Sequence, residues 1–132
     1  MSLFVDTSGL YALLVGTESE HSGIAAAFRT AVEKGRRLVT TNYVLAETSA
    51  LLQSRVGIDP VRDLHHRLLP VLSVIWVTQD LHQRGADRLF RIDRRRVSLV
   101  DAISFTVMED EGLMDVLGVD SDFTAQGFRL VP

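Results

Sequence analysis

Five carboxylates, far apart in this 132-residue sequence, are the side chains best suited to act together chemically. They are Asp6, Glu47, Asp101, Asp120 and Asp122. If the fold brings them together, their like charges repel unless a cation lies between them. A site of oxygen ligands without His or Cys selects a hard divalent ion such as Mg²⁺ or Mn²⁺. The acids therefore predict a divalent-metal site, provided that the elements around them converge.

Asp6 ends a short apolar run at the N-terminus and precedes a helical pattern over residues 10–14. This order predicts a strand that delivers Asp6 to the turn before a helix. In open α/β sheets that turn, at the carboxyl end of a strand, is where ligands bind. Asp, Thr and Ser are also preferred at helix N-caps, and for Asp6 alone a cap is the better explanation. Thr7 and Ser8 could hold the carboxylates or metal waters by hydrogen bonds from outside the ligand set.

Glu47 is the most informative of the acids. On a helical period it shares a row with Val44 and Leu51, so a charged group lies on or beside a face that otherwise points at the core. A buried carboxylate without a partner is costly. Metal ligation and a structural arginine partner are both open explanations.

The other three acids each have a structural explanation as well. Asp101 lies three residues after Ser98, which is the spacing of a helix capping box, yet it also shares the inward row of Phe105. Asp120 and Asp122 follow an apolar strand, where turns and caps are common. Because Asp6 and Asp120 end strands while Glu47 and Asp101 lie near helix starts, all four can face one crevice at the carboxyl edge of a sheet.

The elements that must position these acids alternate between strands and helices. Strands are expected before Asp6 and at residues 37–41, 72–77, 114–119 and 128–131. Helices are expected at residues 10–14, from a Thr17/Glu20 capping box to Gly35, at 42–52, from Asp59 to Pro70, from Thr78 past Phe90, and at 98–108. The alternation predicts a single α/β domain over residues 1–132, with three layers and a mainly parallel sheet of four to five strands.

Apolar patterns also predict where some elements lie. The run 72–77 is almost continuously apolar, which is typical of a strand buried on both faces of a parallel sheet. Trp76 and Phe90 are expected in the core, with Ala86, Leu89 and Phe90 on the inward face of their helix. The helix at 98–108 is apolar on most sides and is therefore expected to be central.

Composition narrows the class of protein. The chain has 46% hydrophobic and 23% charged residues, which is typical of a globular protein. No apolar run reaches transmembrane length and no signal peptide is recognisable. The absence of cysteine excludes disulfides and thiolate metal sites and favours a cytoplasmic protein. The net charge of −3 leaves a nucleic-acid partner possible, because a bound cation would cancel much of a clustered negative charge.

Positive charge is concentrated just before the helix that carries Asp101. Arg94, Arg95 and Arg96 could bind phosphates of a nucleic acid, or they could form an ordinary solvated loop. Arg84, Arg88 and Arg91 extend the positive charge along the preceding helix. The sequence shows no aromatic platform for stacking bases.

Taken together, four segments resemble the PIN-domain nucleases, particularly the VapC-type toxins of toxin-antitoxin pairs. They are Phe-Val-Asp-Thr-Ser at 4–8, Asn-Tyr-Val-Leu-Ala-Glu at 42–47, Ser-Leu-Val-Asp-Ala-Ile-Ser at 98–104, and Asp-Ser-Asp-Phe at 120–123 with Gly-Phe at 127–128. The resemblance spans nearly the whole chain. It implies a catalytic set of Asp6, Glu47, Asp101 and Asp120, with Asp122 as a further metal ligand beside Asp6, Asp101 and Asp120. One departure is Gly118, where many members carry a hydroxyl residue.

The resemblance also implies an activity and partners. They are Mg²⁺- or Mn²⁺-dependent cleavage of RNA, a homodimer, and a cognate antitoxin that blocks the site with a peptide segment. Three alternatives stay open: an RNA-processing nuclease outside a toxin-antitoxin pair, a non-catalytic RNA- or protein-binding module, and a haloacid-dehalogenase-type phosphatase. The last rests on the D-x-D-x-T motif at 120–124, although only eight residues follow Thr124.

Overall fold

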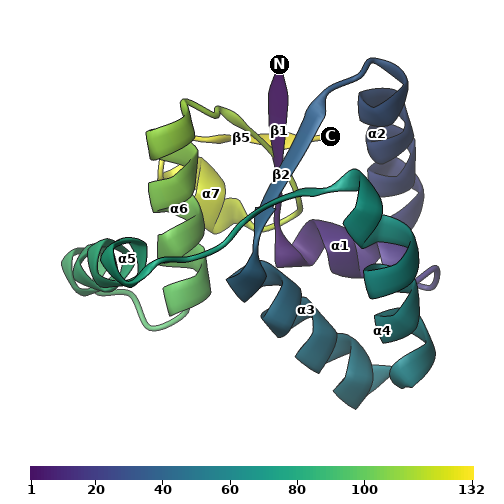
Figure 1. The fold of residues 1–132 in the computed structure, drawn as a ribbon, viewed down its shortest axis with the longest axis horizontal. Coiled ribbons are helices and arrows are strands. Elements are labelled where there is room, and N and C mark those ends of the chain that lie inside the picture. Colours follow the sequence, from purple (N-terminus) through teal and green to yellow (C-terminus); the bar gives the residue numbers. More distant parts are fainter.

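A computed structural model, which describes residues 1–132, shows one sheet of five parallel strands (Figure 1). The strands are β1 (Ser2–Val5), β2 (Arg37–Thr41), β3 (Ser73–Ile75), β4 (Asp115–Leu117) and β5 (Arg129–Val131). They lie in the order β3-β2-β1-β4-β5. The chain runs from β1 outward to β3 and then returns to place β4 on the other side of β1. The carboxyl ends of β1 and β4 therefore flank a topological switch point, where α/β sheets bind ligands.

Helices cover both faces of this sheet. They are α1 (Thr7–Leu14), α2 (His21–Glu33), α3 (Asn42–Arg55), α4 (Ile58–Asp63), α5 (Gln79–Ile92), α6 (Leu99–Glu111) and α7 (Ser121–Ala125). A π-helical turn (Leu64–Leu68) and a 3₁₀ turn (Leu69–Val71) continue α4. In Figure 1, α5, α6 and α7 lie on one side of the strands and α1, α2 and α4 on the other, while α3 extends from the carboxyl end of β2. The predicted three-layer fold is confirmed. No helix combines the length and the apolar character that a membrane-spanning segment requires.

The centre of the core lies between the sheet and α6. Every residue of α6 from Asp101 to Met108 is buried, which confirms the prediction that this helix is central. Phe105 packs edge-on against Phe123 of α7 with ring centroids 4.8 Å apart, and it stacks on Phe128. These contacts fix α7, and with it the residues just after β4, against the middle of α6.

Two predicted core residues are in fact on the surface. Trp76 and Phe90 are each 72% exposed. β3 is an edge strand of the sheet. The apolar run that contains it is therefore only partly buried, and not buried on both faces as predicted. On α5 the buried residues are Leu81 and Gly85, and Phe90 points away from that face. Gly85 lies close enough to α6 for an added Cβ to collide with Ile103, so the absence of a side chain sets which face of α5 packs inward.

The predicted capping box at Thr17 and Glu20 does not form. Helix α2 begins at His21, with Glu20 at its N-cap and no side-chain hydrogen bond there. The imidazole Nδ1 of His21 lies 2.8 Å from the carbonyl oxygen of Ala12, and this hydrogen bond joins the start of α2 to α1. The side chains of Thr17 and Glu20 therefore do not cap α2.

Gly9 allows α1 to lie directly on the end of β4. A Cβ at Gly9 would collide with the carbonyl group of Leu117, whose carbon would be 2.9 Å away. We expect Gly9→Ala to lower the free energy of unfolding by about 1–3 kcal/mol in urea titrations, because a backbone carbonyl cannot move aside. Gly16→Ala is the matched control, since nothing lies within 4 Å of its Cβ. Equal stabilities of the two variants would contradict this close packing.

Candidate active site

Asp6 both caps a helix and lies in a buried position at the switch point. Its Oδ2 accepts hydrogen bonds from the backbone N–H of Ser8 at 3.2 Å and from the Ser8 hydroxyl at 2.8 Å. The residue is 3% exposed, and its other oxygen, Oδ1, is buried without a hydrogen-bond partner. Loss of hydration raises the pKa of Asp6 to about 7, against the opposing effect of the Ser8 bonds, and the charge of Asp101 adds to the rise. The cap therefore accounts for one oxygen and leaves the other available for a cation.

Asp101 is held in the same way at the start of α6. Its backbone N–H donates to the Ser98 hydroxyl at 3.1 Å, and its Oδ2 accepts from the backbone N–H of Ser98 at 3.0 Å, which completes a capping box. Burial raises the pKa of Asp101 to about 6, and the charges of Asp120 and Glu47 contribute to the rise. The capping explanation is correct for Asp101, and the same contacts hold its carboxylate among other acids.

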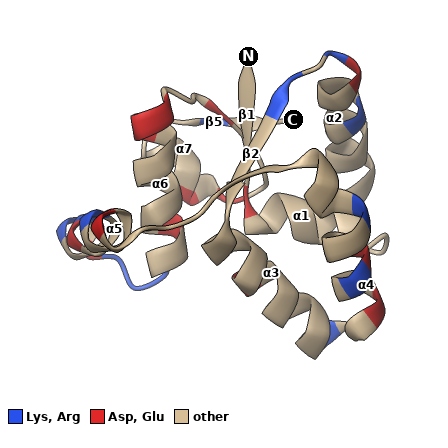
Figure 2. Cartoon of the chain, viewed as in Figure 1, with Lys and Arg blue, Asp and Glu red and all other residues tan.

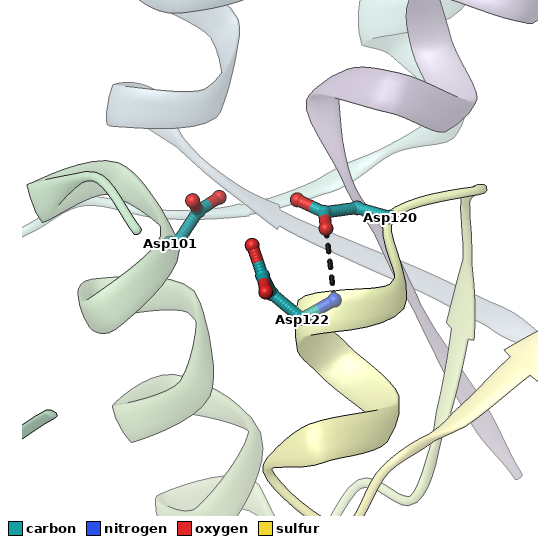
Figure 3. Close-up of side chains that lie close together, drawn as sticks. All are labelled: Asp101, Asp120 and Asp122. Atoms are coloured by element: carbon teal, nitrogen blue, oxygen red, sulfur yellow. Dashed lines mark hydrogen bonds between the residues drawn. The ribbon is translucent and has the colours of Figure 1, made fainter. Parts of the chain in front are cut away.

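Asp120 and Asp122 lie at the start of α7 and face Asp101 (Figure 3). Oδ1 of Asp120 accepts the backbone N–H of Asp122 at 2.9 Å, so Asp120 is the N-cap of this short helix. The carboxylates of Asp101, Asp120 and Asp122 each have an oxygen within 4.8 Å of the others. Asp122 differs from the other two because its buried side chain forms an ion pair with Arg96. Its Oδ1 accepts a hydrogen bond from Nε of Arg96 at 3.0 Å and lies 2.9 Å from Nη2.

Asp6, Glu47, Asp101 and Asp120 line one cleft of about 400 Å³ at the carboxyl edge of the sheet. Glu47 reaches it from α3, where it is half-buried. Glu47 forms no ion pair with any arginine, so a structural arginine partner does not explain its position. Asp122 does not line this cleft.

Three further charged residues line the cleft that sequence reasoning did not identify as site residues. They are Glu18, Glu20 and Arg55. Glu18 and Glu20 come from the segment between α1 and α2, and no sequence pattern links them to the other acids. Arg55 lies two helical turns after Glu47 on the same row of α3, so extending that row would have found it. Its guanidinium lies over the ring of Tyr11, 5.5 Å from the centroid.

The residues of this cleft fit a hard divalent ion. The donors are carboxylate oxygens, and the unpartnered Oδ1 of Asp6 is the kind of buried polar atom that requires a ligand. The Thr7 hydroxyl, in the same cleft, is also buried without a partner. Asp6, Asp101 and Asp120 are the residues suited to hold the ion.

Ser8 takes the place where the resemblance leads us to expect a hydroxyl at residue 118. Its hydroxyl donates to Asp6 and accepts the backbone N–H of Val119 at 3.0 Å, so it joins the start of α1 to the chain just after β4. A Cβ at Gly118 would lie 2.7 Å from this hydroxyl. The glycine therefore makes room for Ser8 beside Asp6.

The three loop arginines differ in their surroundings. Arg94, Arg95 and Arg96 are exposed and line a shallow hollow between α5 and α6, where Figure 2 shows the blue loop. Arg96 alone also lines the acidic cleft. The predicted extension of positive charge along α5 is largely neutralised, because Arg84 pairs with Asp80 and Asp110, and Arg88 pairs with Glu109.

Comparison with known proteins identifies the class to which this fold and site belong. Residues 3–128 match the PIN domain family, and the chain belongs to that family. It is 39% identical over 127 residues to the 23S rRNA-specific endonuclease VapC20 of Mycobacterium tuberculosis, covering 96% of this chain and 95% of that protein. The predicted resemblance is confirmed, and the phosphatase alternative based on Asp120 to Thr124 is wrong.

Solved structures give the same result. The crystal structure of Mycobacterium tuberculosis VapC20, described as a sarcin-ricin loop cleaving toxin, has a TM-score of 0.89 and 36% identity, covering 99% of this chain and 100% of that one. Two more distant structures share the fold. PAE2754 from Pyrobaculum aerophilum has a TM-score of 0.67 and 20% identity, covering 99% of this chain and 90% of that one. FitAcB from Neisseria gonorrhoeae has a TM-score of 0.70 and 11% identity, covering 98% of this chain and 96% of that one.

The raised pKa values of Asp6 and Asp101 predict an unusual pH dependence of stability without metal. Both carboxyls hold their protons more tightly in the folded state, so their contribution is full below pH 3.8 and is lost as the pH rises to about 7. From these two groups alone, we expect the free energy of unfolding, measured by urea titration in EDTA, to fall by roughly several kcal/mol over this pH range. Asp6→Asn should reduce the fall, and Mn²⁺ should restore stability most at neutral pH. Identical pH profiles for Asp6→Asn and the wild type would contradict the assignment.

Proposed function

We propose that this protein is a Mg²⁺- or Mn²⁺-dependent endoribonuclease that acts as the toxin of a toxin-antitoxin pair. The observation that carries the proposal is the convergence of Asp6, Glu47, Asp101 and Asp120 on one cleft in which none of the four is ion-paired. Membership of the PIN family and 39% identity to an rRNA endonuclease support RNA as the substrate. An RNA substrate also favours a cytoplasmic location.

The residues of the cleft have different roles in the proposed hydrolysis. Asp6, Asp101 and Asp120 would hold the metal, each with one oxygen already fixed by a helix-start N–H or, for Asp6, also by a hydroxyl. The chemistry that a divalent ion would supply there is activation of water and neutralisation of charge on the departing oxygen. Glu47, which lines the same cleft from α3, orients the attacking water and accepts its proton. Arg94, Arg95 and Arg96 bind phosphates of the RNA.

We further propose a homodimer and a cognate antitoxin as partners. Exposed Trp76 and Phe90 offer apolar surface for protein contacts. The cleft is strongly acidic, because six acids and two arginines line it. A cationic peptide segment of an antitoxin would therefore be attracted to it and would compete with the metal.

Asp6→Asn tests the metal site. We expect it to reduce Mn²⁺-dependent cleavage of RNA by more than about 100-fold, the upper end of what loss of an outer-sphere partner costs. The folded protein should be at least as stable at pH 7 as the wild type, because the substitution removes a buried charge that disfavours folding. Asp63→Asn on α4, outside the cleft, is the control and should leave cleavage unchanged. Full activity of Asp6→Asn would rule out the proposed site.

The three loop arginines are tested by salt dependence. Replacing Arg94, Arg95 and Arg96 together by Ala should weaken RNA binding and lower the slope of log K against log salt by about 2 to 3. Binding is measured by fluorescence anisotropy in EDTA, so that cleavage does not interfere. Arg62→Ala with Arg67→Ala, in α4 and in the π-helical turn that follows it, is the control for loss of positive charge away from the cleft. An unchanged slope in the loop variant would show that the three arginines form a solvated loop.

A further inference from the structure

Arg96 belongs to both the acidic cleft and the arginine loop. It lines the cleft with Asp101 and Asp120, and it lines the outer hollow with Arg94 and Arg95. Its side chain is 69% exposed, whereas that of its partner Asp122 is 9% exposed. The guanidinium is therefore held by Asp122 on its inner side and exposed to solvent on its outer side.

The ion pair between Arg96 and Asp122 is a two-point contact. Nε of Arg96 donates a hydrogen bond to Oδ1 of Asp122 at 3.0 Å, and Nη2 lies 2.9 Å from the same oxygen. The guanidinium N–H groups that are not directed at Asp122 remain free at the rim of the cleft. A charge-assisted contact to a buried carboxylate restricts the guanidinium far more than a surface ion pair would.

Asp122 also holds the carboxylate of Asp120 in place. Its backbone N–H donates to Oδ1 of Asp120 at 2.9 Å, as Figure 3 shows. A single residue thus sets the position of an acid of the metal site through its main chain and the position of a cation through its side chain. Because Arg96 already neutralises the Asp122 carboxylate, a divalent ion bound there would be repelled by the charge of the guanidinium.

We propose that Asp122 is a positioning residue and not a metal ligand, and that it holds Arg96 so that its free N–H groups bind the scissile phosphate. This inference rests on the proposed nuclease function and assigns different roles to the three arginines. Arg96 contacts the reacting phosphate, and it acts most strongly as negative charge develops on the phosphate oxygens. Arg94 and Arg95, which have no such carboxylate partner, neutralise phosphates away from the scissile bond.

The roles separate in steady-state kinetics with an RNA substrate and saturating Mn²⁺. We expect Arg96→Ala to lower kcat by roughly 100-fold, as loss of a preorganised donor does. Arg94→Ala should raise KM severalfold with little effect on kcat. Arg96→Lys keeps the charge but cannot make the two-point contact, so its kcat should stay near that of Arg96→Ala. Arg62→Ala on α4 is the control without effect.

Asp122 is tested by coupling and by metal binding. We expect Asp122→Asn to lower kcat, and the double variant with Arg96→Ala to be no slower than Arg96→Ala alone, since both remove the same contact. Calorimetric titration of Mn²⁺ into RNA-free protein should give Asp122→Asn an affinity within about twofold of the wild type, whereas Asp101→Asn should bind at least about tenfold more weakly.

Three results would overturn this assignment. They are equal loss of Mn²⁺ affinity in Asp122→Asn and Asp101→Asn, multiplicative effects of the Asp122 and Arg96 substitutions on kcat, and an Arg96→Ala variant that behaves like Arg94→Ala. If Asp122→Asn fails to fold, the comparison of Arg96→Lys with Arg96→Ala and Arg94→Ala decides, because Arg96 is exposed. Failure of the nuclease proposal itself would be recognised separately, as the absence of Mn²⁺-dependent cleavage by the wild type.

Discussion

Mutual repulsion of carboxylates that the fold forces together is the constraint on which the site depends. Asp6, Asp101 and Asp120 lie at the starts of three helices, and each helix start supplies an N–H group that fixes one carboxylate oxygen. The positive ends of helices favour negative charge. This help does not offset burial, since the pKa values of Asp6 and Asp101 rise to about 7 and about 6. At neutral pH the folded chain therefore concentrates more negative charge than its own groups stabilise, and a bound divalent cation would offset this charge.

This constraint explains why capping and metal binding are not competing explanations of the same residues. An N-cap uses one oxygen of an Asp and directs the other away from the helix. Asp6 shows this most clearly, because Oδ2 is bound by Ser8 while Oδ1 has no partner. The sequence predicted the convergence of the acids from their places at strand ends and helix starts, since parallel strands direct their carboxyl ends to one edge. It could not decide between cap and ligand, because both roles select the same residue types.

Other features could not be predicted because they depend on which neighbour each element receives. The apolar run of β3 suits a central or an edge strand equally well, and the sheet order makes it an edge, which leaves Trp76 exposed. Phe90 and Leu89 are adjacent on α5, and only the close approach at Gly85 decides which of them turns inward. Arg84 and Arg96 belong to the same predicted stretch of positive charge, yet Asp110 on α6 neutralises one while the other reaches Asp122 on α7. Such pairings join residues that no sequence periodicity relates.

The junction of α1 and β4 shows how a local choice of residues shapes the site. Gly9 brings α1 onto the carbonyl of Leu117, and Gly118 leaves space for the Ser8 hydroxyl to bridge Asp6 and Val119. A side chain at either glycine would push the start of α1 away from the chain that leads to Asp120. Because Asp6 and Asp120 sit on the two sides of this junction, their separation is set by contacts that contain no acid at all. The hydroxyl expected at residue 118 is thus supplied by the neighbouring helix, and the cleft keeps its support although one residue of the motif differs.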